Sequence, residues 1–338
     1  MPAADLIALD VGGANLKAAD GHGWAHAEAF PLWREWRRVP ETLARIIGGA
    51  GACRVVATMT GEIADCYASR AEGVAHIVES LVAAAGGADV GIYLVDGSIV
   101  APEEAARRPL EAAASNWHAL ARLAAAHAES PTAVLVDVGS TTTDVVPLRD
   151  GRPAALAHDD AGRMLSGELV YSGLERTPLA TIVRSLPHRG VRRPVAAERF
   201  ADSRDCWLLL GELAEDAADL DTADGGPATR EAARVRLARS VLVEPADFTA
   251  ADAVAAAAWA AEAQVRRVAW AVRSVTLRQP DPPGSVVFSG HGEPLARRAV
   301  TRALPGVATE SLAAALGPAA SRAACAHALA LIARGEIA

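Results

Sequence analysis

The sequence contains no apolar run of about 18 residues, the length that a membrane-spanning helix requires. It has no excess of positive charge either, because its formal net charge is -8, and this argues against broad binding of nucleic acid. Its four cysteines are widely separated and form no Cys-x-x-Cys pair, so buried apolar residues are a better interpretation than disulfides or zinc ligands. The first residues show a strand pattern and no charged, apolar leader. These absences predict a cytoplasmic protein with no membrane and no nucleic-acid partner.

Lysine is almost absent as well, because Lys17 is the only one among the basic side chains and arginine serves in its place elsewhere. Lysine is a compact point charge, whereas arginine presents a wide planar fork. Lys17 therefore suggests a site with room for an ammonium group and not for a guanidinium group. The alternative is a surface strand residue that has remained by chance.

The two common nucleotide-binding loops, Gly-x-x-x-x-Gly-Lys-Ser/Thr and Gly-x-Gly-x-x-Gly opening a helix, are both missing. The chain instead carries a buried strand, a glycine turn and a second strand at residues 6–17, and repeats this pattern at 134–146. Aligning Asp10 with Asp137 makes Asp-Val-Gly coincide and places Lys17 on Asp144. The two copies lie too far apart for a solenoid, so they predict an internal duplication with two related domains.

The predicted organisation is α/β, with a first domain at 1–130 and a second at 131–338. Each reads as three strands followed by helix, strand, helix, strand and helix, and the second carries a mainly helical insertion at about 159–243. Ser115 is expected to cap a helix that starts at Asn116. The other predicted strands are 24–33, 54–58, 91–95, 142–148, 152–157 and 285–289, and the other predicted helices are 41–47, 68–85, 250–277 and 318–333.

Phosphate binding by such hairpins would depend on turn N–H groups, which form an anion-binding nest. The glycines let the backbone approach a ligand closely, the hydroxyl cluster after Gly139 adds donors, and Lys17 adds positive charge. The predicted phosphate-binding residues are Gly12, Gly13, Asn15, Lys17, Gly139, Ser140, Thr141, Thr142 and Thr143.

Three acids, Asp10, Asp137 and Asp144, are expected near one cleft from the hairpin pattern. Acids that face phosphates repel them unless a cation intervenes, and Mg²⁺ takes one or two carboxylates together with phosphate oxygens and waters. We therefore predict Mg²⁺ as cofactor with these three acids as ligands. The alternative is that Asp10 and Asp137 accept hydrogen bonds from turn N–H groups.

Polar residues also follow the strand at 54–58, at the strand end where ligands of open α/β sheets gather. Thr58 and Thr60 are candidates for substrate binding, and Glu62 is preferred as a general base. For Asp65, a general base and a helix cap remain equally open. Asn116 and Trp117 are candidates for orienting a substrate, with core packing of the tryptophan as the alternative. The run 158–160 and the loop residue His291 are interpreted as solvated loop positions.

A third motif, at residues 286–293, follows a strand of the second domain. With the two hairpins, it makes the chain resemble the superfamily of acetate kinase, sugar kinases, Hsp70 and actin. The resemblance implies two ribonuclease-H-like domains that face each other across a cleft, as in actin and hexokinase, with the turns binding phosphates. It also implies that Ser289 and Gly290 contact a substrate or an adenosine.

A narrower resemblance is carried by residues 9–17, 58–65, 114–117, 136–144 and 166–173. These segments resemble the hydantoinase/oxoprolinase-related proteins of tetrahydromethanopterin-linked one-carbon metabolism, whose archaeal members act in methylofuran biosynthesis. The resemblance implies a transferase that joins an aminomethylfuran-methyl diphosphate to a tyramine- or tyrosine-derived phenol and releases diphosphate. Lys17, Glu62, Asp65 and Asp144 would then be catalytic, with Mg²⁺ as cofactor; ATP is not favoured, and a homodimer remains open.

Two alternatives remain at this point. One is an ATP-dependent kinase or amidohydrolase of the same fold, which would turn over ATP. The other is a non-catalytic regulator that binds nucleotide without turnover. Three acids and a unique lysine favour an enzyme.

Overall fold

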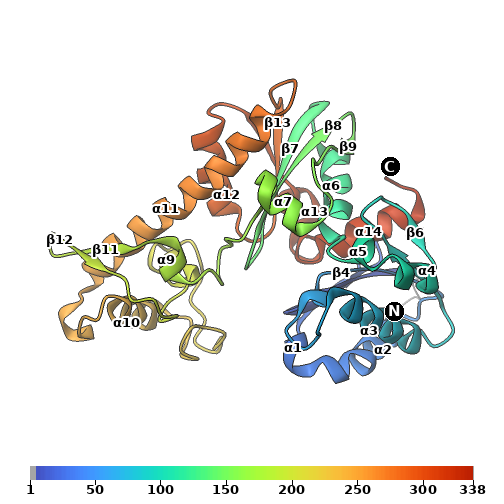
Figure 1. Cartoon of the computed structure of the whole chain (residues 1–338), viewed down its shortest axis with the longest axis horizontal. Coiled ribbons are helices and arrows are strands. Elements are labelled where there is room, and N and C mark those ends of the chain that lie inside the picture. Colours follow the sequence, from blue (N-terminus) through green and yellow to red (C-terminus); the bar gives the residue numbers. More distant parts are fainter. Residues whose placement is uncertain (1–4, 338) are drawn as a thin grey trace.

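The two hairpins predicted from the sequence each start a separate sheet in the computed structural model, which describes residues 5–337 (Figure 1). The first sheet has the order β3-β2-β1-β4-β5-β6. The β1–β2 hairpin is antiparallel, and β1, β4 and β5 run parallel to one another. Its strands are β1 (Leu6–Val11), β2 (Asn15–Ala19), β3 (Ala25–Ala29), β4 (Arg54–Met59), β5 (Asp89–Tyr93) and β6 (Ile99–Val100).

The second sheet repeats this arrangement in the order β10-β8-β7-β13-β14, with β9 also paired to β8. The β7–β8 hairpin is antiparallel, while β7, β13 and β14 are parallel. This repetition confirms the predicted fold class. Its strands are β7 (Thr132–Val138), β8 (Thr143–Arg149), β9 (Arg152–Pro153), β10 (Leu169–Val170), β13 (Ser285–Ser289) and β14 (Ala308–Ser311).

Helices cover the outer face of each sheet because the central strands are apolar on both sides. Ile7 and Leu9 of β1 pack in one cluster with Leu43 and Ile77 from the helices below the first sheet. The helices of this first part are α1 (Leu32–Glu35), α2 (Val39–Ala50), α3 (Arg70–Ala84), α4 (Pro102–Arg107), α5 (Pro109–Ala112) and α6 (Asn116–His127). Those after the second hairpin are α7 (Asp160–Ser166), α8 (Leu179–Ile182), α9 (Ser203–Leu209), α10 (Arg230–Ser240), α11 (Ala250–Leu277), α12 (Glu293–Ala303), α13 (Leu312–Arg322) and α14 (Ala324–Arg334).

A middle layer made by α6 and α14 lies between the two sheets, as Figure 1 shows. One hydrophobic cluster joins Leu6 and Val56 of the first sheet to Leu135 of the second through residues such as Leu120 and Leu329 of these helices. The last helix of the chain therefore covers the first sheet. The division into domains at 130/131 remains a prediction, and this shared layer links the two halves.

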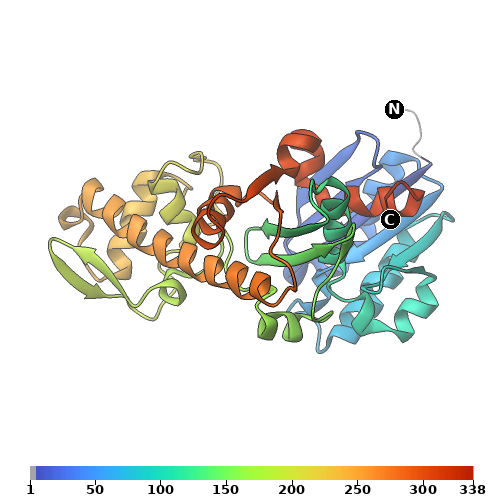
Figure 2. The same cartoon turned by 90° about the horizontal axis from the view of Figure 1, so that it is seen from above.

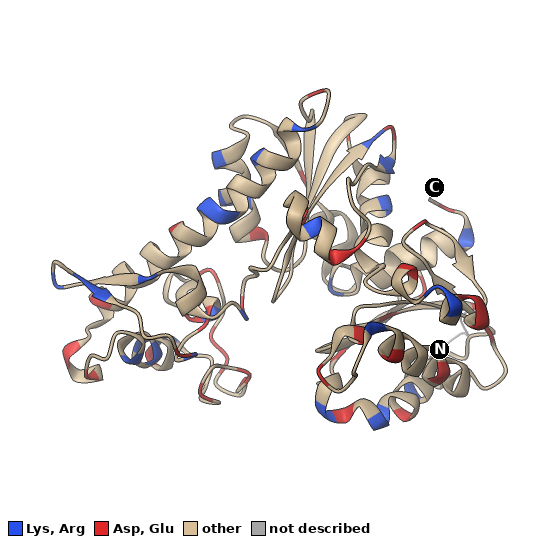
Figure 3. Cartoon of the chain, in the orientation of Figure 1, with Lys and Arg blue, Asp and Glu red and all other residues tan. Residues whose placement is uncertain are grey.

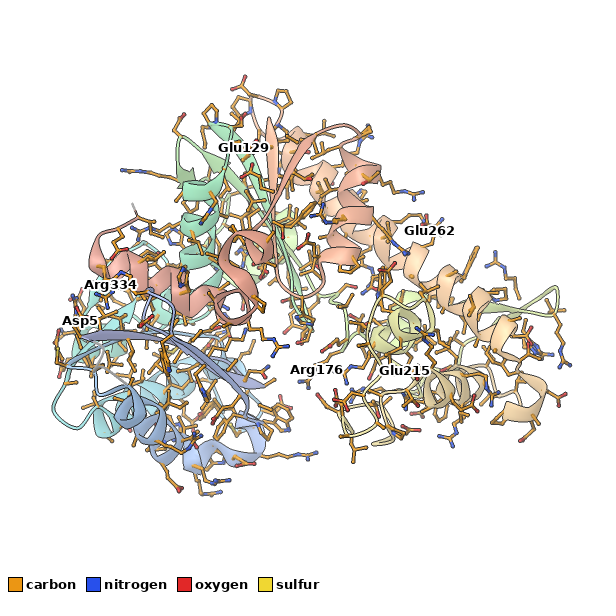
Figure 4. All side chains as sticks on the ribbon, turned by 180° about the vertical axis from the view of Figure 1, so that it is seen from behind. Asp5, Glu129, Arg176, Glu215, Glu262 and Arg334 are labelled. Carbon is orange, nitrogen blue, oxygen red and sulfur yellow. The ribbon has the colours of Figure 1, made fainter. Side chains whose placement is uncertain are left out.

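The last helix is tied to the start of the first sheet at its far end as well. Arg334 Nη1 donates to Asp5 Oδ2 at 3.0 Å, and Arg334 Nε donates to the Asp20 carbonyl at 3.1 Å. Figure 4 labels this Asp5–Arg334 pair. Figure 3 shows acidic and basic residues interspersed over the N-terminal part and the insertion.

Within residues 5–337, no single helix has the length and apolar character needed to cross a membrane, although α13 and α14 meet these criteria as a pair bent by 96°.

The insertion forms a lobe on the N-terminal half of α11, which extends from the second sheet (Figure 2). Ala256 and Ala260 of α11 pack there with Leu186, Leu237 and Phe248. The lobe contains helices α8, α9 and α10, but also the hairpin of β11 (Ser185–His188) and β12 (Val191–Pro194) and long loops. The expectation of a mainly helical insertion is therefore wrong, because the segment is rich in turns.

Local predictions fail where proline or a buried polar group intervenes. The strand expected at 24–33 stops at Ala29, and α1 begins after Pro31, which has no N–H for a strand ladder. The helix expected at 318–333 is two helices with a sharp bend. Ser115 stands at the start of α6 but makes no capping bond.

Candidate functional site

The two hairpins place charged residues at equivalent positions in the two sheets. Asp10 on β1 lies directly opposite Lys17 on β2, and Asp137 on β7 lies directly opposite Asp144 on β8. This register confirms the predicted alignment of the two copies, including the match of Lys17 with Asp144. Residues at opposed positions point to the same face of a sheet, so each acid shares its face with its partner.

Lys17 interacts electrostatically with acids from both hairpins. Its Nζ lies 3.9 Å from Asp10 Oδ2, and about a third of its side chain is exposed compared with 4% of the aspartate side chain. Burial favours the neutral amine, but the negative charges of Asp10 and, more weakly, Asp137 outweigh it and raise the pKa of Lys17. Lys17 is therefore cationic and lies within the field of acids from both sheets.

The acids around Lys17 are held in an unfavourable environment. Burial raises the pKa of Asp10, with Lys17 opposing it, and Asp10 Oδ1 has no hydrogen-bond partner among the described residues. Burial and the neighbouring Asp144 raise the pKa of Asp137 to about 6. The alternative that these acids accept turn N–H groups is wrong, because Gly12 N and Gly139 N donate to the backbone carbonyls of residues 15 and 142.

A magnesium site can be tested against these groups. No group of three His, Cys, Asp or Glu side chains within residues 5–337 is arranged to hold a metal ion, so Asp10, Asp137 and Asp144 do not form one ligand set as predicted. Asp137 and Asp144 still offer two carboxylates at opposed cross-strand positions, where two acids repel each other. Arg163 already balances part of the Asp144 charge, and Mg²⁺ would balance the rest. Mg²⁺ needs only one or two carboxylates.

The glycine turns leave open space beside these charges. A Cβ added at Gly13 would meet no atom within 4 Å, and one at Gly139 would meet only the Thr142 carbonyl at 3.8 Å. Glycine at these two positions is therefore not required by the packing of the protein itself. Gly12 differs, because its added Cβ would lie 2.8 Å from the carbonyl of Asn15, whose own side chain is exposed.

The hydroxyl groups divide into two sets. Ser140, Thr141 and Thr142 are partly exposed at the second turn, where a ligand can reach them. Thr143 is buried and donates to the Ser172 carbonyl at 2.7 Å, so its predicted phosphate contact is wrong.

Thr58 lies on β4, the strand beside β1, and resembles Thr143 because its hydroxyl is buried and hydrogen-bonded. It is fully buried, and its Oγ1 lies 2.8 Å from Ser115 Oγ. A direct contact of Thr58 with substrate is therefore wrong. The same bond explains why Ser115 does not cap α6, because its hydroxyl is used inside the core. Thr60 remains partly exposed, and its N–H donates to the Val11 carbonyl at 3.0 Å.

Glu62 is a second buried acid of the first unit with a raised pKa. It is buried in the turn after β4, and neither carboxylate oxygen has a hydrogen-bond partner within residues 5–337. Burial raises its pKa to about 7, and nearby Arg70 only partly offsets this. Asp65 is exposed, and α3 is capped by Ser69, so the prediction that Asp65 caps this helix is wrong.

Arg163, which no sequence motif singles out, links Trp117 to Asp144. Its guanidinium lies 4.0 Å from the centroid of the Trp117 ring, and its Nη2 donates to Asp144 Oδ1 at 2.7 Å. Arg163 and Trp117 are both buried, so the alternative of core packing holds for the tryptophan. Asn116 Oδ1 accepts from the Trp117 N–H at 2.8 Å, which satisfies the start of α6.

A second unpredicted ion pair connects the two halves. Arg70 at the start of α3 lies 2.7 Å from Asp160 at the start of α7. Both side chains are mostly buried, so interpretation of Asp160 as a solvated loop residue is wrong. The charges of both influence Glu62, which places Glu62 beside this connection.

The third motif supports Asp137 from the neighbouring strand. Ser289 is buried and stands directly beside Asp137 in the parallel ladder. Gly290 has a φ of +80°, and an added Cβ would lie 2.2 Å from the Val138 carbonyl. Close packing therefore requires glycine at position 290, and its substrate contact stays a prediction. His291 is half exposed and lies 3.7 Å from Glu175.

A surface cavity of about 270 Å³ lies at β3 and α2. Its acids are paired, because Glu28 binds Arg45 and both Glu35 and Glu41 bind Arg38. These acids therefore differ from Glu62 and from Asp10 Oδ1, which have no hydrogen-bond partner among the described residues.

Comparison with known proteins gives a consistent result. Residues 54–332 match the hydantoinase/oxoprolinase family. A Methanocaldococcus jannaschii protein named (4-{4-[2-(γ-L-glutamylamino)ethyl]phenoxymethyl}furan-2-yl)methanamine synthase is 33% identical over 237 residues, which cover 69% of this chain and 70% of that protein. A Methanococcus vannielii protein of the same name is 37% identical over 106 residues, 31% of this chain and 47% of that protein. Both names denote an enzyme.

Two solved structures resemble the fold. A glucokinase of the ROK family from Streptomyces griseus, in complex with glucose and AMPPNP, matches with a TM-score of 0.50 and 11% identity, over 98% of this chain and 99% of that one. A nucleotide-free acetone carboxylase matches with a TM-score of 0.51 and 14% identity, over 91% of this chain and 50% of that one. Both support the two-unit fold alone.

Proposed function

Because the chain belongs to the hydantoinase/oxoprolinase family, we propose that it catalyses a condensation in the biosynthesis of a methylofuran-type cofactor. The substrates are an aminomethylfuran-methyl diphosphate and a tyramine- or tyrosine-derived phenol. The support is the product named for its relatives, which contains a phenoxymethyl-furan ether. Nucleotide takes no part in this reaction.

The reaction makes one bond and breaks one. The phenol oxygen forms a C–O bond with the methylene carbon of the furan, and the C–O bond from that carbon to the diphosphate breaks. The electron pair of the broken bond leaves with the diphosphate, and the phenol proton passes to a base. The enzyme must therefore stabilise developing negative charge on the diphosphate and accept one proton.

One observation carries this proposal. The only lysine of the chain lies where acids of both hairpins converge, and the glycine turns beside it leave space that the packing of the protein does not need. A diphosphate fits such a place, because turn N–H groups and an ammonium group both stabilise anionic oxygen.

Magnesium completes the charge balance in this proposal. Asp137 and Asp144 would hold it. When bound, Mg²⁺ neutralises negative charge on phosphate oxygens. Lys17 would bind the same leaving group from the other hairpin. The acids then serve to hold cations near the diphosphate instead of repelling it.

Glu62 is the favoured base. A phenol has an ordinary pKa of about 10, so a carboxylate with its usual low pKa removes the proton inefficiently. Burial raises the pKa of Glu62 to about 7, which brings it close to the operating pH, where a general base works best. Asp65 is exposed and is the less favoured of the two candidates.

Mass spectrometry of the purified protein with the furan diphosphate, Mg²⁺ and tyramine tests the proposal. We expect the ether product together with an equal amount of diphosphate. Phenethylamine, which lacks the hydroxyl group, is the matched control and should give no ether. Hydrolysis of ATP without ether formation from any phenol would instead favour an ATP-dependent kinase or amidohydrolase.

A further inference from the structure

A cation that the proposed reaction has not used lies between the two units. The guanidinium of Arg176 lies 5.4 Å from the centroid of the Trp33 ring, within the range of a cation–π contact. Trp33 belongs to α1 of the first unit, and Arg176 follows the second hairpin and β10. Figure 4 labels Arg176 between the N-terminal unit and the insertion lobe. Among residues 5–337, its guanidinium makes no hydrogen bond and no ion pair.

Each partner is fixed to one of the two glycine turns. The N–H groups of Glu175 and Arg176 donate to the Ser140 carbonyl at 3.0 and 2.8 Å. On the other side, Leu32, the neighbour of Trp33, donates its N–H to the Gly13 carbonyl at 3.0 Å. The contact between Trp33 and Arg176 therefore connects the two turns.

Close packing keeps the Arg176 segment against its turn. A Cβ added at Gly173 would lie 2.6 Å from the carbonyls of Gly139 and Ser140, so the chain before Arg176 lies directly on the turn. The backbone position of Arg176 is thus set by the same turn that is proposed to bind phosphate.

The local charges leave Arg176 unbalanced. The nearest acid in sequence, Glu175, lies 3.2 Å from Arg204 and 3.7 Å from His291. Burial opposes ionisation of Glu175, but its interactions with His291 and Arg204 hold its pKa at about 2. Since Glu175 has its own partners, it does not neutralise Arg176.

We propose that Arg176 and Trp33 form a subsite for the terminal phosphate of a diphosphate, at the junction of the two turns. An arginine fork can donate two parallel hydrogen bonds to one phosphate, and the Trp33 ring orients the guanidinium for this. The identity of the anion as the leaving diphosphate rests on the proposed function. Lys17 and Arg176 would then act on it from opposite hairpins.

Calorimetric titration with inorganic pyrophosphate in a magnesium buffer tests this subsite without relying on turnover. Arg176→Ala should weaken binding by about 10- to 100-fold, because a charge-assisted hydrogen bond is lost. Trp33→Leu should weaken it less, since the charge remains. The matched control is Arg192→Ala, which removes another arginine–tryptophan contact, 3.4 Å from the Trp259 centroid on the outer lobe, and should leave the affinity unchanged.

The outcomes separate the two proposals. Unchanged affinity in both Arg176→Ala and Arg176→Lys, with wild-type melting temperatures, would overturn the subsite and leave the proposed function intact. No binding of pyrophosphate by the wild-type protein would overturn the proposed function and the subsite with it. If Arg176→Ala does not fold, Arg176→Lys decides the question, because it keeps the charge, loses the fork and should weaken binding.

Discussion

Replacement of Glu62 by glutamine should stabilise the protein at alkaline pH and inactivate it. Burial raises the pKa of Glu62 from 4.5 to about 7, so between these values the folded state binds more protons than the unfolded state. Stability linked to this group is present below pH 4.5 and is lost as the pH rises through 7. At about 1.4 kcal/mol per pH unit, the loss at pH 8 is about 3 kcal/mol.

The glutamine variant carries no charge at any pH and resembles the protonated acid. The free energy of unfolding of Glu62→Gln minus that of the wild type should therefore rise by about 2–3 kcal/mol from pH 5 to pH 8. Urea denaturation at both pH values measures this difference. Glu79→Gln, an exposed position on the neighbouring helix α3, is the control and should show no such change. A difference for Glu62→Gln that stays constant between pH 5 and pH 8 would refute the reasoning.

Turnover gives a second, independent measurement on the same variant. If Glu62 accepts the phenol proton, wild-type turnover should rise with pH to a plateau above an apparent pKa of about 7. Glu62→Gln should lose turnover at every pH although it is the more stable protein at pH 8. A stabilised variant with normal turnover would refute the role as base and leave the account of burial intact.

Three further predictions concern the charges at the hairpins. Lys17→Arg should lower turnover by about 10²- to 10³-fold with an unchanged melting temperature; near-normal steady-state turnover would make the unique lysine an accident of composition. Excess chelator should abolish turnover, and added Mg²⁺ should restore it; full activity in chelator would show that the reaction does not need magnesium. In paired kinetic and thermal measurements, Asp10→Asn and Asp137→Asn should lower activity more than stability. Arg163→Met should cost about 3–5 kcal/mol in urea denaturation, because it leaves Asp144 buried without its partner, and adding Asp144→Asn should recover part of this; strictly additive losses would contradict the argument.

Much of the fold could be predicted because its signals are local. The hairpin repeat required only a strand pattern and an acid before a glycine turn. The structure places Asp10 opposite Lys17 and Asp137 opposite Asp144, so the two copies match as aligned. The predicted helix 250–277 has the bounds of α11, since Thr249 and Asp252 form a capping box at its start. Helix ends without such caps, as at the bend between α13 and α14, were not predicted.

The candidate site was predicted less completely because burial and pairing depend on the folded chain. Arg163 looks in sequence like any arginine of an Arg-rich segment, and only packing reveals that it lies against Trp117 and binds Asp144. Thr58 looks like a ligand residue at a strand end, but its hydroxyl forms a hydrogen bond with the hydroxyl of Ser115 at the start of α6. Glu62 was identified from its position after a strand, whereas its raised pKa follows from its surroundings.

The position of α14 has a consequence for synthesis of the protein. The strands of the first sheet are translated first, but Leu6 and Val56 on one face of it are covered by residues from the last helix, such as Leu329. Chains are synthesised at about 5–20 residues per second, so this apolar face stays exposed for many seconds before α14 can cover it. The N-terminal half therefore cannot bury this face until α14 has been synthesised, and it is during this interval that we expect chaperones to matter most for the yield of folded protein.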